Sequence, residues 1–324
     1  MTREGGWLRL AIILTAANFA IALALMPRVD GLVPALRILP AWMAGASLAG
    51  VIMLVAHLAR QGVASPIREL AALLKRERGR VIGVLLILLV AGLNMVAFMW
   101  IKTLLNYLVP FWADPLLAYG DSLIFLGADP WRLLAPYVFP GAGKVYHPLW
   151  FTIMIVLLVM AAWAPASARR SAVLLSYFLL WSVVGPLVHC LLPAGGPIFY
   201  AELGYGPRFA DIVPTGETRE VASYLWEIFS SGSFGAGSGI SAMPSMHVTM
   251  SAWMVIASAA LAPRLLVPVS LSAALVAVLS VALGWHYALD GIVGGLCALA
   301  VYRILLALFA GEFRQKVAAA PQGA

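Results

Sequence analysis

The sequence predicts an all-α fold, a polytopic membrane helix bundle of about eight transmembrane helices. Apolar residues make up 63% of the 324 residues and charged residues only 11%. Soluble domains carry about 25% charged residues, so most of the surface of this chain cannot face water. The apolar residues also fall into long runs, most of which reach the roughly 20 residues that a helix needs to cross a bilayer core.

Eight such runs give the expected transmembrane segments in chain order. They cover residues 8–26, 40–58, 81–101, 147–165, 171–191, 245–262, 265–284 and 287–309. The first run also has features of a secretory signal, because Arg3 and Arg9 are followed by an apolar stretch containing a small-x-small pattern at 22–24. We expect an uncleaved first span, because many spans follow it, and either outcome leaves the later topology unchanged.

Two segments between the expected spans are too long to be simple connections. Residues 102–146 contain Asp114, Asp121 and Asp129 among aromatic and aliphatic residues, which predicts short interfacial helices between the third and fourth spans. Residues 192–244 are rich in glycine and proline, and long loops of this kind are more often functional than idle. Both segments are therefore candidates for covering a functional site.

The basic residues set the expected orientation. With the N-terminus in the cytoplasm, 14 of the 21 basic residues fall on the inner side and 10 of the 14 acidic residues on the outer side. The net charge of +7 then belongs to cytoplasmic loops, and no nucleic-acid partner is expected. The excess of arginine over lysine suggests a GC-rich bacterial genome, and hence a bacterial inner membrane. The distribution of charge places both termini in the cytoplasm and the predicted functional side in the periplasm.

The chain divides into three expected regions. Residues 1–80 form N-terminal transmembrane helices and a basic cytoplasmic loop, residues 81–310 form a catalytic transmembrane domain, and residues 311–324 form a cytoplasmic tail. Two cysteines in apolar runs, Cys190 and Cys297, make no disulfide framework.

Two histidine motifs bracket the sixth and seventh spans. Pro-Ser-Met-His at 244–247 opens the sixth span, and Gly-Trp-His-Tyr at 284–287 precedes the eighth. His247 and His286 are 39 positions apart, which is enough for one helix down and one back. Both histidines are therefore expected at the same outer interface.

Asp290 follows His286 by four residues, so the two share one face of a helix. A carboxylate there can accept the Nδ1 proton of His286 and leave Nε2 as a nucleophile or base. An ionisable residue inside a span is costly and is by default a functional hypothesis. The start of the sixth helix also offers unpaired backbone amides beside Ser245, which suits a phosphate. Together these features predict a phosphoryl-transfer site.

These two motifs resemble those of the type 2 phosphatidic acid phosphatase superfamily. They are most similar to the branch of inositol phosphorylceramide synthase, the aureobasidin-resistance type inositolphosphotransferases, with sphingomyelin synthase more distant. The resemblance implies that His286 forms a phosphohistidine, that Asp290 orients it, and that His247 protonates the leaving oxygen. It also implies a membrane-embedded helical core that needs no cofactor.

The sequence departs from the phosphatase pattern where that pattern holds phosphate. The Lys-x6-Arg-Pro motif is matched only by Lys102 followed by Val-Pro at 109–110, without the arginine. The Ser-Arg pair before the second histidine is replaced by Leu-Ser at 279–280, and the glycine of the first motif by Met246. These departures favour the synthase branch.

Other residues must then bind the substrate. The candidates to supply the missing charge are Arg208 first, then Lys144 and Arg132 in the outer segments. The remaining expected substrate-binding residues are Ser245, His189 and Tyr287, and His147 also lies near the outer interface.

The sequence therefore predicts a lipid phosphotransferase or phosphatase acting at the outer membrane face. Its substrate would be a phospholipid or lipid phosphate, and its acceptor a hydroxyl such as that of inositol or a lipid alcohol. A lipid phosphate or prenyl pyrophosphate phosphatase is the first alternative. A second alternative is a proton-coupled transporter or flippase that uses Asp290, which the absence of a strong internal repeat disfavours. A third is a metal-dependent hydrolase with His247, His286 and Asp290 as metal ligands. We expect no metal and no cofactor.

Overall fold

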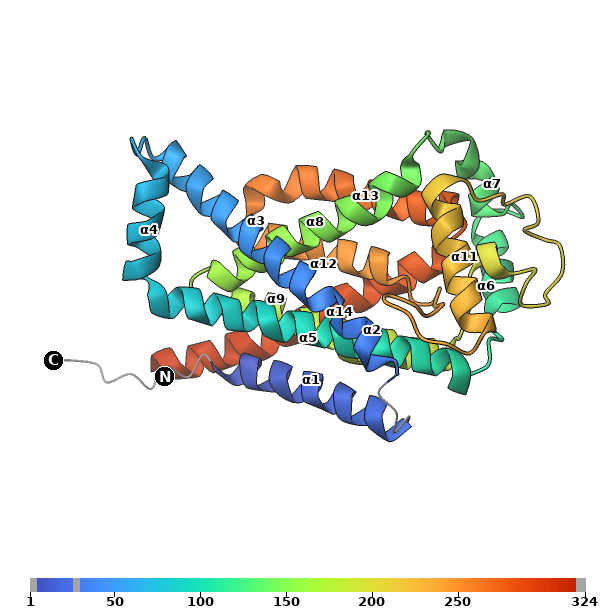
Figure 1. The fold of residues 1–324 in the computed structure, drawn as a ribbon, viewed down its shortest axis with the longest axis horizontal. Coiled ribbons are helices and arrows are strands. Elements are labelled where there is room, and N and C mark those ends of the chain that lie inside the picture. The colour runs from blue at the N-terminus through green and yellow to red at the C-terminus, as the bar shows by residue number, and fades with distance from the viewer. Residues whose placement is uncertain (1–4, 26–29, 319–324) are drawn as a thin grey trace.

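The computed structural model describes residues 5–25 and 30–318, and within these residues the chain forms helices and loops without a strand. The long helices run along one common axis (Figure 1). They are α1 (Gly5–Leu25), α3 (Ile38–Arg60), α5 (Arg78–Leu108), α8 (Ala142–Trp163), α9 (Ala168–Leu179), α12 (Met246–Leu261), α13 (Leu266–Ala282) and α14 (Ala288–Ala318). The predicted class, an all-α polytopic membrane bundle, is confirmed.

Seven helical segments of the described residues are long and apolar enough to cross a membrane. They are Gly6–Leu25, Leu32–Arg60, Arg78–Leu108, Ala142–Trp163, Ala168–Leu191, Pro263–Ala282 and Ala288–Gly311. The remaining predicted span, the sixth at 245–262, corresponds to α12, which has only 16 residues and would measure about 24 Å against a core of about 30 Å. Its N-cap, Ser245, is completely buried, so α12 begins inside the bundle rather than at its surface.

Three of the seven segments are composite, and the sixth of them joins the 3₁₀ turn η4 (Pro263–Leu265) to α13. The second joins α2 (Leu32–Leu36) to α3, and the fifth joins α9 to α10 (Gly185–Leu191) through a π-helical turn, η2 (Leu180–Val184). Pro186 lies at the start of α10, where it has no amide proton to donate to the helical ladder. The widened π turn accommodates this missing donor without ending the span.

Shorter helices lie at the two ends of the bundle (Figure 1). At one end α4 (Pro66–Arg76) crosses the bundle axis, and the other end carries α6 (Asp114–Ile124), α7 (Pro130–Leu134) and α11 (Gly216–Ser230). The expected interfacial helices between the third and fourth spans are present as α6 and α7. The glycine- and proline-rich composition of the later segment did not predict α11.

The motif-bearing helix α12 lies at the centre of the bundle, where it packs against α8, α9, α13 and α14. Thr249 of α12 is fully buried, and a Cβ atom added at Gly294 of α14 would collide with its hydroxyl. Only glycine therefore permits this close approach of the two backbones. The contact holds α12 and α14, and with them both predicted motifs, in a fixed relation.

Candidate active site

A tight turn between α13 and α14 positions His286. Gly284 has a φ angle of +79°, a left-handed conformation that favours glycine, and its amide donates to the Val281 carbonyl over 2.9 Å. The His286 amide then donates to the Ser280 carbonyl over 3.1 Å. These backbone bonds fold the chain back on α13 and place the imidazole inside the protein, where its side chain is 7% exposed.

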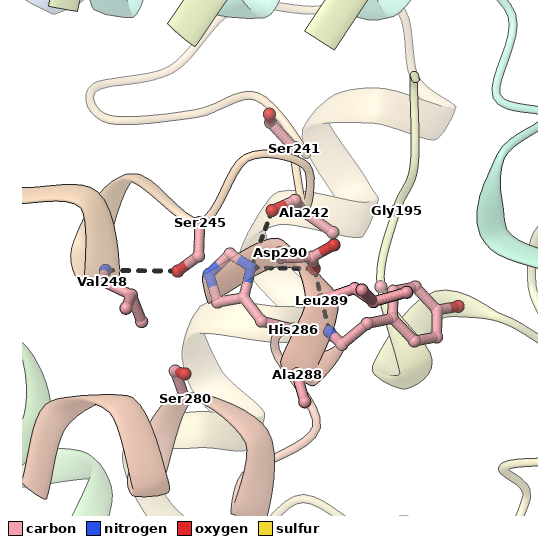
Figure 2. Close-up of polar contacts among 12 residues, drawn as sticks. Gly195, Ser241, Ala242, Ser245, Val248, Ser280, His286, Ala288, Leu289 and Asp290 are labelled. Carbon is pink, nitrogen blue, oxygen red and sulfur yellow. Dashed lines mark hydrogen bonds and ion pairs between the residues drawn. The ribbon is translucent and has the colours of Figure 1, made fainter. Parts of the chain in front are cut away.

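The Nδ1 atom of His286 faces two acceptors. It lies 2.9 Å from the carbonyl oxygen of Ala242 and 3.5 Å from Oδ2 of Asp290. Figure 2 shows the other ring nitrogen turned away from both groups. Because both neighbours of Nδ1 can only accept from a neutral imidazole, the proton resides on Nδ1 and Nε2 keeps its lone pair. The sequence identified the carboxylate as an acceptor, and the structure adds a nearer one from the backbone.

The carboxyl group of Asp290 is completely buried and joins the two motifs. Its Oδ2 accepts the amide of Tyr287 over 2.8 Å, and the Asp290 carbonyl accepts the amide of Ser245 over 3.2 Å. Ser245 in turn caps α12, because its hydroxyl accepts the Val248 amide over 3.3 Å. The buried Ser245 hydroxyl thus has a partner within the protein, and the role of Ser245 in substrate binding stays a prediction.

His247 lies on the first turn of α12, and its imidazole centroid is 6.2 Å from that of His286. Aromatic rings surround it, with centroids 4.5 Å away at Trp150 and 4.9 Å away at Tyr146. The structure thus brings His247, His286 and Asp290 together, as their spacing predicts. Their catalytic roles stay predictions.

Both histidines line one cavity of about 710 Å³, a size suited to a lipid headgroup with part of its chains. Its walls are largely apolar, with side chains such as Met95, Phe98 and Trp181. A larger cavity of about 790 Å³ lies between α3, α5 and α8 near His57 and contains none of the predicted site residues. The smaller cavity is therefore the candidate active site.

A family model described as the PAP2 superfamily matches residues 131–304, which is more than half of the chain and includes both histidine motifs. The chain belongs to the PAP2 superfamily. Membership implies phosphatase or phosphotransferase activity on lipid-type phosphoesters. No curated protein and no solved structure matches the chain. The superfamily prediction is confirmed, whereas the inositol phosphorylceramide synthase branch and the region boundaries at 80 and 310 stay predictions.

The lining of the cavity in this PAP2 protein includes one lysine, Lys102, which lies on α5. No carboxylate among the described residues pairs with its ammonium group. Lys102 lines the same cavity as His147, His247 and His286. The sequence did contain a signal, the partial Lys-x6-Arg-Pro match, but the missing arginine led us to discount it.

The next residues of α5 hold the loop that covers this cavity. The Asn106 amide donates to the Ile240 carbonyl over 2.6 Å and accepts the Ile240 amide over 2.5 Å, while the hydroxyls of Thr103 and Ser238 lie 3.1 Å apart. The side chain of Asn106 thus pairs with the N–H and C=O groups of Ile240 as the backbone of a neighbouring strand would, and it fixes the position of this residue. Lys102 and this loop are therefore positioned by the same helix.

His189 lies behind the cavity rather than in its lining. It is buried, and its Nδ1 lies 3.0 Å from the hydroxyl of Ser241, which does line the cavity. The predicted role of His189 in direct substrate binding stays a prediction. Its geometry suits it to hold Ser241 and the loop that carries it.

The structure does not bring the other expected substrate ligands into the cavity. The Arg208 guanidinium lies 2.7 Å from Asp129 Oδ1 and donates to the Ala118 carbonyl over 2.9 Å, which uses its hydrogen-bonding capacity elsewhere. Lys144 is exposed at the start of α8. These substrate-binding roles stay predictions, and Lys102 is the cation that lines the cavity.

Two aspartates of α6, which the sequence indicated only as interfacial, hold loops that adjoin the second histidine motif. Asp114 is completely buried and accepts the amides of Gly195 and Gly196 over 2.9 and 2.8 Å and the hydroxyl of Tyr287 over 2.9 Å. Tyr287 therefore supports the loop and is not part of the cavity lining, and its role in substrate binding stays a prediction. Burial raises the pKa of Asp114, and these three hydrogen bonds oppose the rise.

Asp121 makes a similar contact at the start of α14. Its Oδ2 and Oδ1 accept the amides of Ala288 and Leu289 over 2.7 and 2.9 Å, which caps the helix that carries Asp290. Burial raises the pKa of Asp121, while the two amides oppose the rise. The segment between the third and fourth spans thus positions the catalytic motif.

In the part of the chain that the structure describes, no group of three or more histidine, cysteine or acidic side chains is placed to hold a metal ion. The alternative in which His247, His286 and Asp290 are metal ligands therefore has no geometry to support it. The expectation that activity needs no metal stays a prediction.

Proposed function

We propose that this PAP2 protein is a membrane-embedded lipid phosphotransferase that uses a phosphohistidine on His286. The observation that supports this most directly is the orientation of His286. Its Nδ1 is held by two acceptors, and its second nitrogen is left with a lone pair in a cavity shared with His247 and Lys102. That is the arrangement an imidazole needs to act as a nucleophile at phosphorus.

The proposed reaction has two halves. In the first, His286 Nε2 attacks phosphorus, the bond from phosphorus to the leaving oxygen breaks, and protonated His247 gives that oxygen its proton. In the second, an acceptor hydroxyl attacks the phosphohistidine, the N–P bond breaks, and His247 takes the hydroxyl proton. Lys102 balances charge on the phosphate oxygens in both halves.

The charge of the cavity favours a phosphodiester over a phosphomonoester. A monoester carries close to two negative charges near neutral pH, whereas a diester carries one. The cavity lining has one fixed cation, Lys102, besides its histidines, and one carboxylate, Glu217. A phospholipid whose phosphate links two alcohols therefore suits it better than a terminal phosphate. The helix α11 and the loop 236–241 line the same cavity and can limit the access of water to the phosphohistidine.

Analysis of the products tests this proposal. Purified protein in bilayers is given labelled phospholipid with and without inositol or ceramide, and the lipids are identified by mass spectrometry. We expect the phospho-headgroup to move to the added hydroxyl compound. Rapid release of free phosphate from phosphatidic acid or a prenyl pyrophosphate, with no added alcohol ever phosphorylated, would instead establish a phosphatase.

Replacing Lys102 by methionine should lower kcat/KM for the phospholipid by about 10²- to 10³-fold, because a preorganised cation is lost from a site with little water. Lys102→Arg should retain part of the activity, since the charge is kept. The measurement is steady-state transfer by folded, detergent-purified protein. Lys75→Gln, which alters an exposed lysine of α4 at the other end of the bundle, is the matched control and should leave the rate unchanged. Near wild-type activity in Lys102→Met would remove Lys102 from the mechanism.

The proposed orientation places both termini in the cytoplasm and the cavity at the periplasmic face of a bacterial inner membrane. In a variant with Cys190 and Cys297 replaced by alanine, a cysteine at exposed position Ala201 should react with an impermeant thiol reagent in intact cells. A cysteine at exposed position Arg76 should react only after lysis. The opposite pattern would reverse the orientation.

A further inference from the structure

One face of α11 lines the cavity. The four residues that contribute are Glu217, Val221, Tyr224 and Leu225, whose spacing of four, three and one positions places them on the same side of the helix. Glu217 lies in the first turn and is the only acidic residue in the lining of this cavity. The proposed chemistry of His286, His247 and Lys102 does not use it.

Close packing between the first turns of α8 and α11 fixes the position of Glu217. A Cβ atom added at Gly143 would lie 2.7 Å from the Thr218 hydroxyl and 3.2 Å from the Thr218 amide nitrogen, so a larger residue would separate the helices. One turn further along α8 is His147, whose Nδ1 lies 3.9 Å from Oε1 of Glu217. The two side chains therefore face each other across this helix contact.

His147 continues the row of imidazoles in the cavity. Its ring centroid is 5.2 Å from that of His247 and 6.3 Å from that of Trp285. The side chains of His147 and Glu217 are 33% and 29% exposed, whereas that of His286 is 7% exposed. The pair thus lies next to His247 and is more exposed than His286.

The charge of Glu217 decides what can bind there. A carboxylate repels phosphate oxygens, so this part of the cavity disfavours the phosphate that Lys102 attracts. A carboxylate accepts hydrogen bonds from hydroxyl groups. A neutral imidazole such as that of His147 has one ring nitrogen that can accept a hydrogen bond as well. Two acceptors beside the general base match an uncharged, hydroxyl-bearing molecule.

We propose that His147 and Glu217 form the binding subsite for the hydroxyl-bearing acceptor, a polyol or a lipid alcohol. They hold its attacking hydroxyl beside His247, which removes the proton as the new O–P bond forms and the His286 N–P bond breaks. The inference rests on the proposed phosphotransferase activity and assigns its second half-reaction to residues outside the two PAP2 motifs. His147 and Glu217 position the acceptor, whereas His247 remains the base.

The two half-reactions can be measured separately. Single-turnover formation of acid-labile phosphoenzyme from labelled phospholipid reports the first half, and the KM for added acceptor, inositol or ceramide, reports the second. In Glu217→Gln and His147→Gln the phosphoenzyme should form at the wild-type rate within about twofold. The KM for the acceptor should rise by about tenfold or more, as expected for loss of a hydrogen bond to a charged group. The share of label lost to water should rise as well.

Glu220→Gln is the matched control, because Glu220 lies on the same helix but is exposed and does not line the cavity; it should change neither quantity. Slow phosphoenzyme formation in Glu217→Gln would assign the carboxylate to the donor lipid and overturn the inference. An unchanged KM for the acceptor in both variants would also overturn it. If Glu217→Gln fails to fold, His147→Gln decides alone. Wild-type protein that forms no phosphoenzyme would refute the proposed function itself, so the two failures are distinguishable.

Discussion

The variant His286→Ala should lose turnover by about 10⁵- to 10⁶-fold and form no acid-labile phosphoenzyme, since losses of this size follow removal of an enzyme nucleophile. The imidazole is held at Nδ1 by the Ala242 carbonyl and by Asp290, so its Nε2 is the nitrogen available for attack. Alanine removes that lone pair and leaves the loop backbone intact. The measurement combines product formation from labelled phospholipid with the label retained on the protein.

Two comparison variants make this result specific. His57→Gln alters an exposed histidine at the other end of the bundle and should leave the rate unchanged. In Asp290→Asn, turnover should fall by less than the roughly 10⁴-fold that follows when a carboxylate alone sets the tautomer of a histidine. The reason is that the Ala242 carbonyl still accepts the Nδ1 proton of His286 at 2.9 Å. Near wild-type activity in His286→Ala would remove the phosphohistidine mechanism altogether.

The spans could be predicted because crossing a bilayer is a property of a single run of residues. Length and hydropathy predicted eight spans, and seven of them correspond to helical segments long enough to cross a membrane. The exception, α12, is short because its first residue is set by burial of Ser245 against Asp290, a contact between segments far apart in the sequence. The π turn at Leu180–Val184 likewise depends on how the chain relaxes around Pro186.

The histidine motifs could be predicted for a similar reason. The spacing from His286 to Asp290 is short, although His286 lies in the turn before α14 and not on the helix itself as expected. The spacing from His247 to His286 corresponds to two spans. By contrast, Lys102, His147 and Glu217 come from three separate helices, and only tertiary packing brings them to the same cavity. No local pattern identifies such a group.

Arg208 has a partner that the sequence did not indicate, and its role in substrate binding stays a prediction. A basic residue in the loop that leads to the catalytic segment was a reasonable phosphate ligand, but Asp129, 79 positions earlier, pairs with it. The sequence contains both residues without indicating that they meet. Because this ion pair joins distant segments, only the tertiary structure reveals it.

The variant His247→Ala should lose about 10³- to 10⁴-fold in turnover of a natural phospholipid, the upper range for loss of a general acid. The alcohol that leaves such a lipid is strongly basic and needs a proton as its bond to phosphorus breaks. A p-nitrophenyl phosphodiester has a leaving group that needs no proton. With that substrate His247→Ala should still form phosphoenzyme, at a rate within about tenfold of wild type.

This difference between substrates separates acid catalysis from a structural role. His247 contacts Tyr146, His147 and Trp150, so its removal leaves space among aromatic rings that also line or adjoin the cavity. Damage to that packing would slow attack on both substrates alike, because His286 would be misplaced in each. Loss of a proton donor slows only the substrate with the poor leaving group. Equal losses with the two substrates would therefore contradict a general-acid role for His247 and leave it as a residue that shapes the cavity.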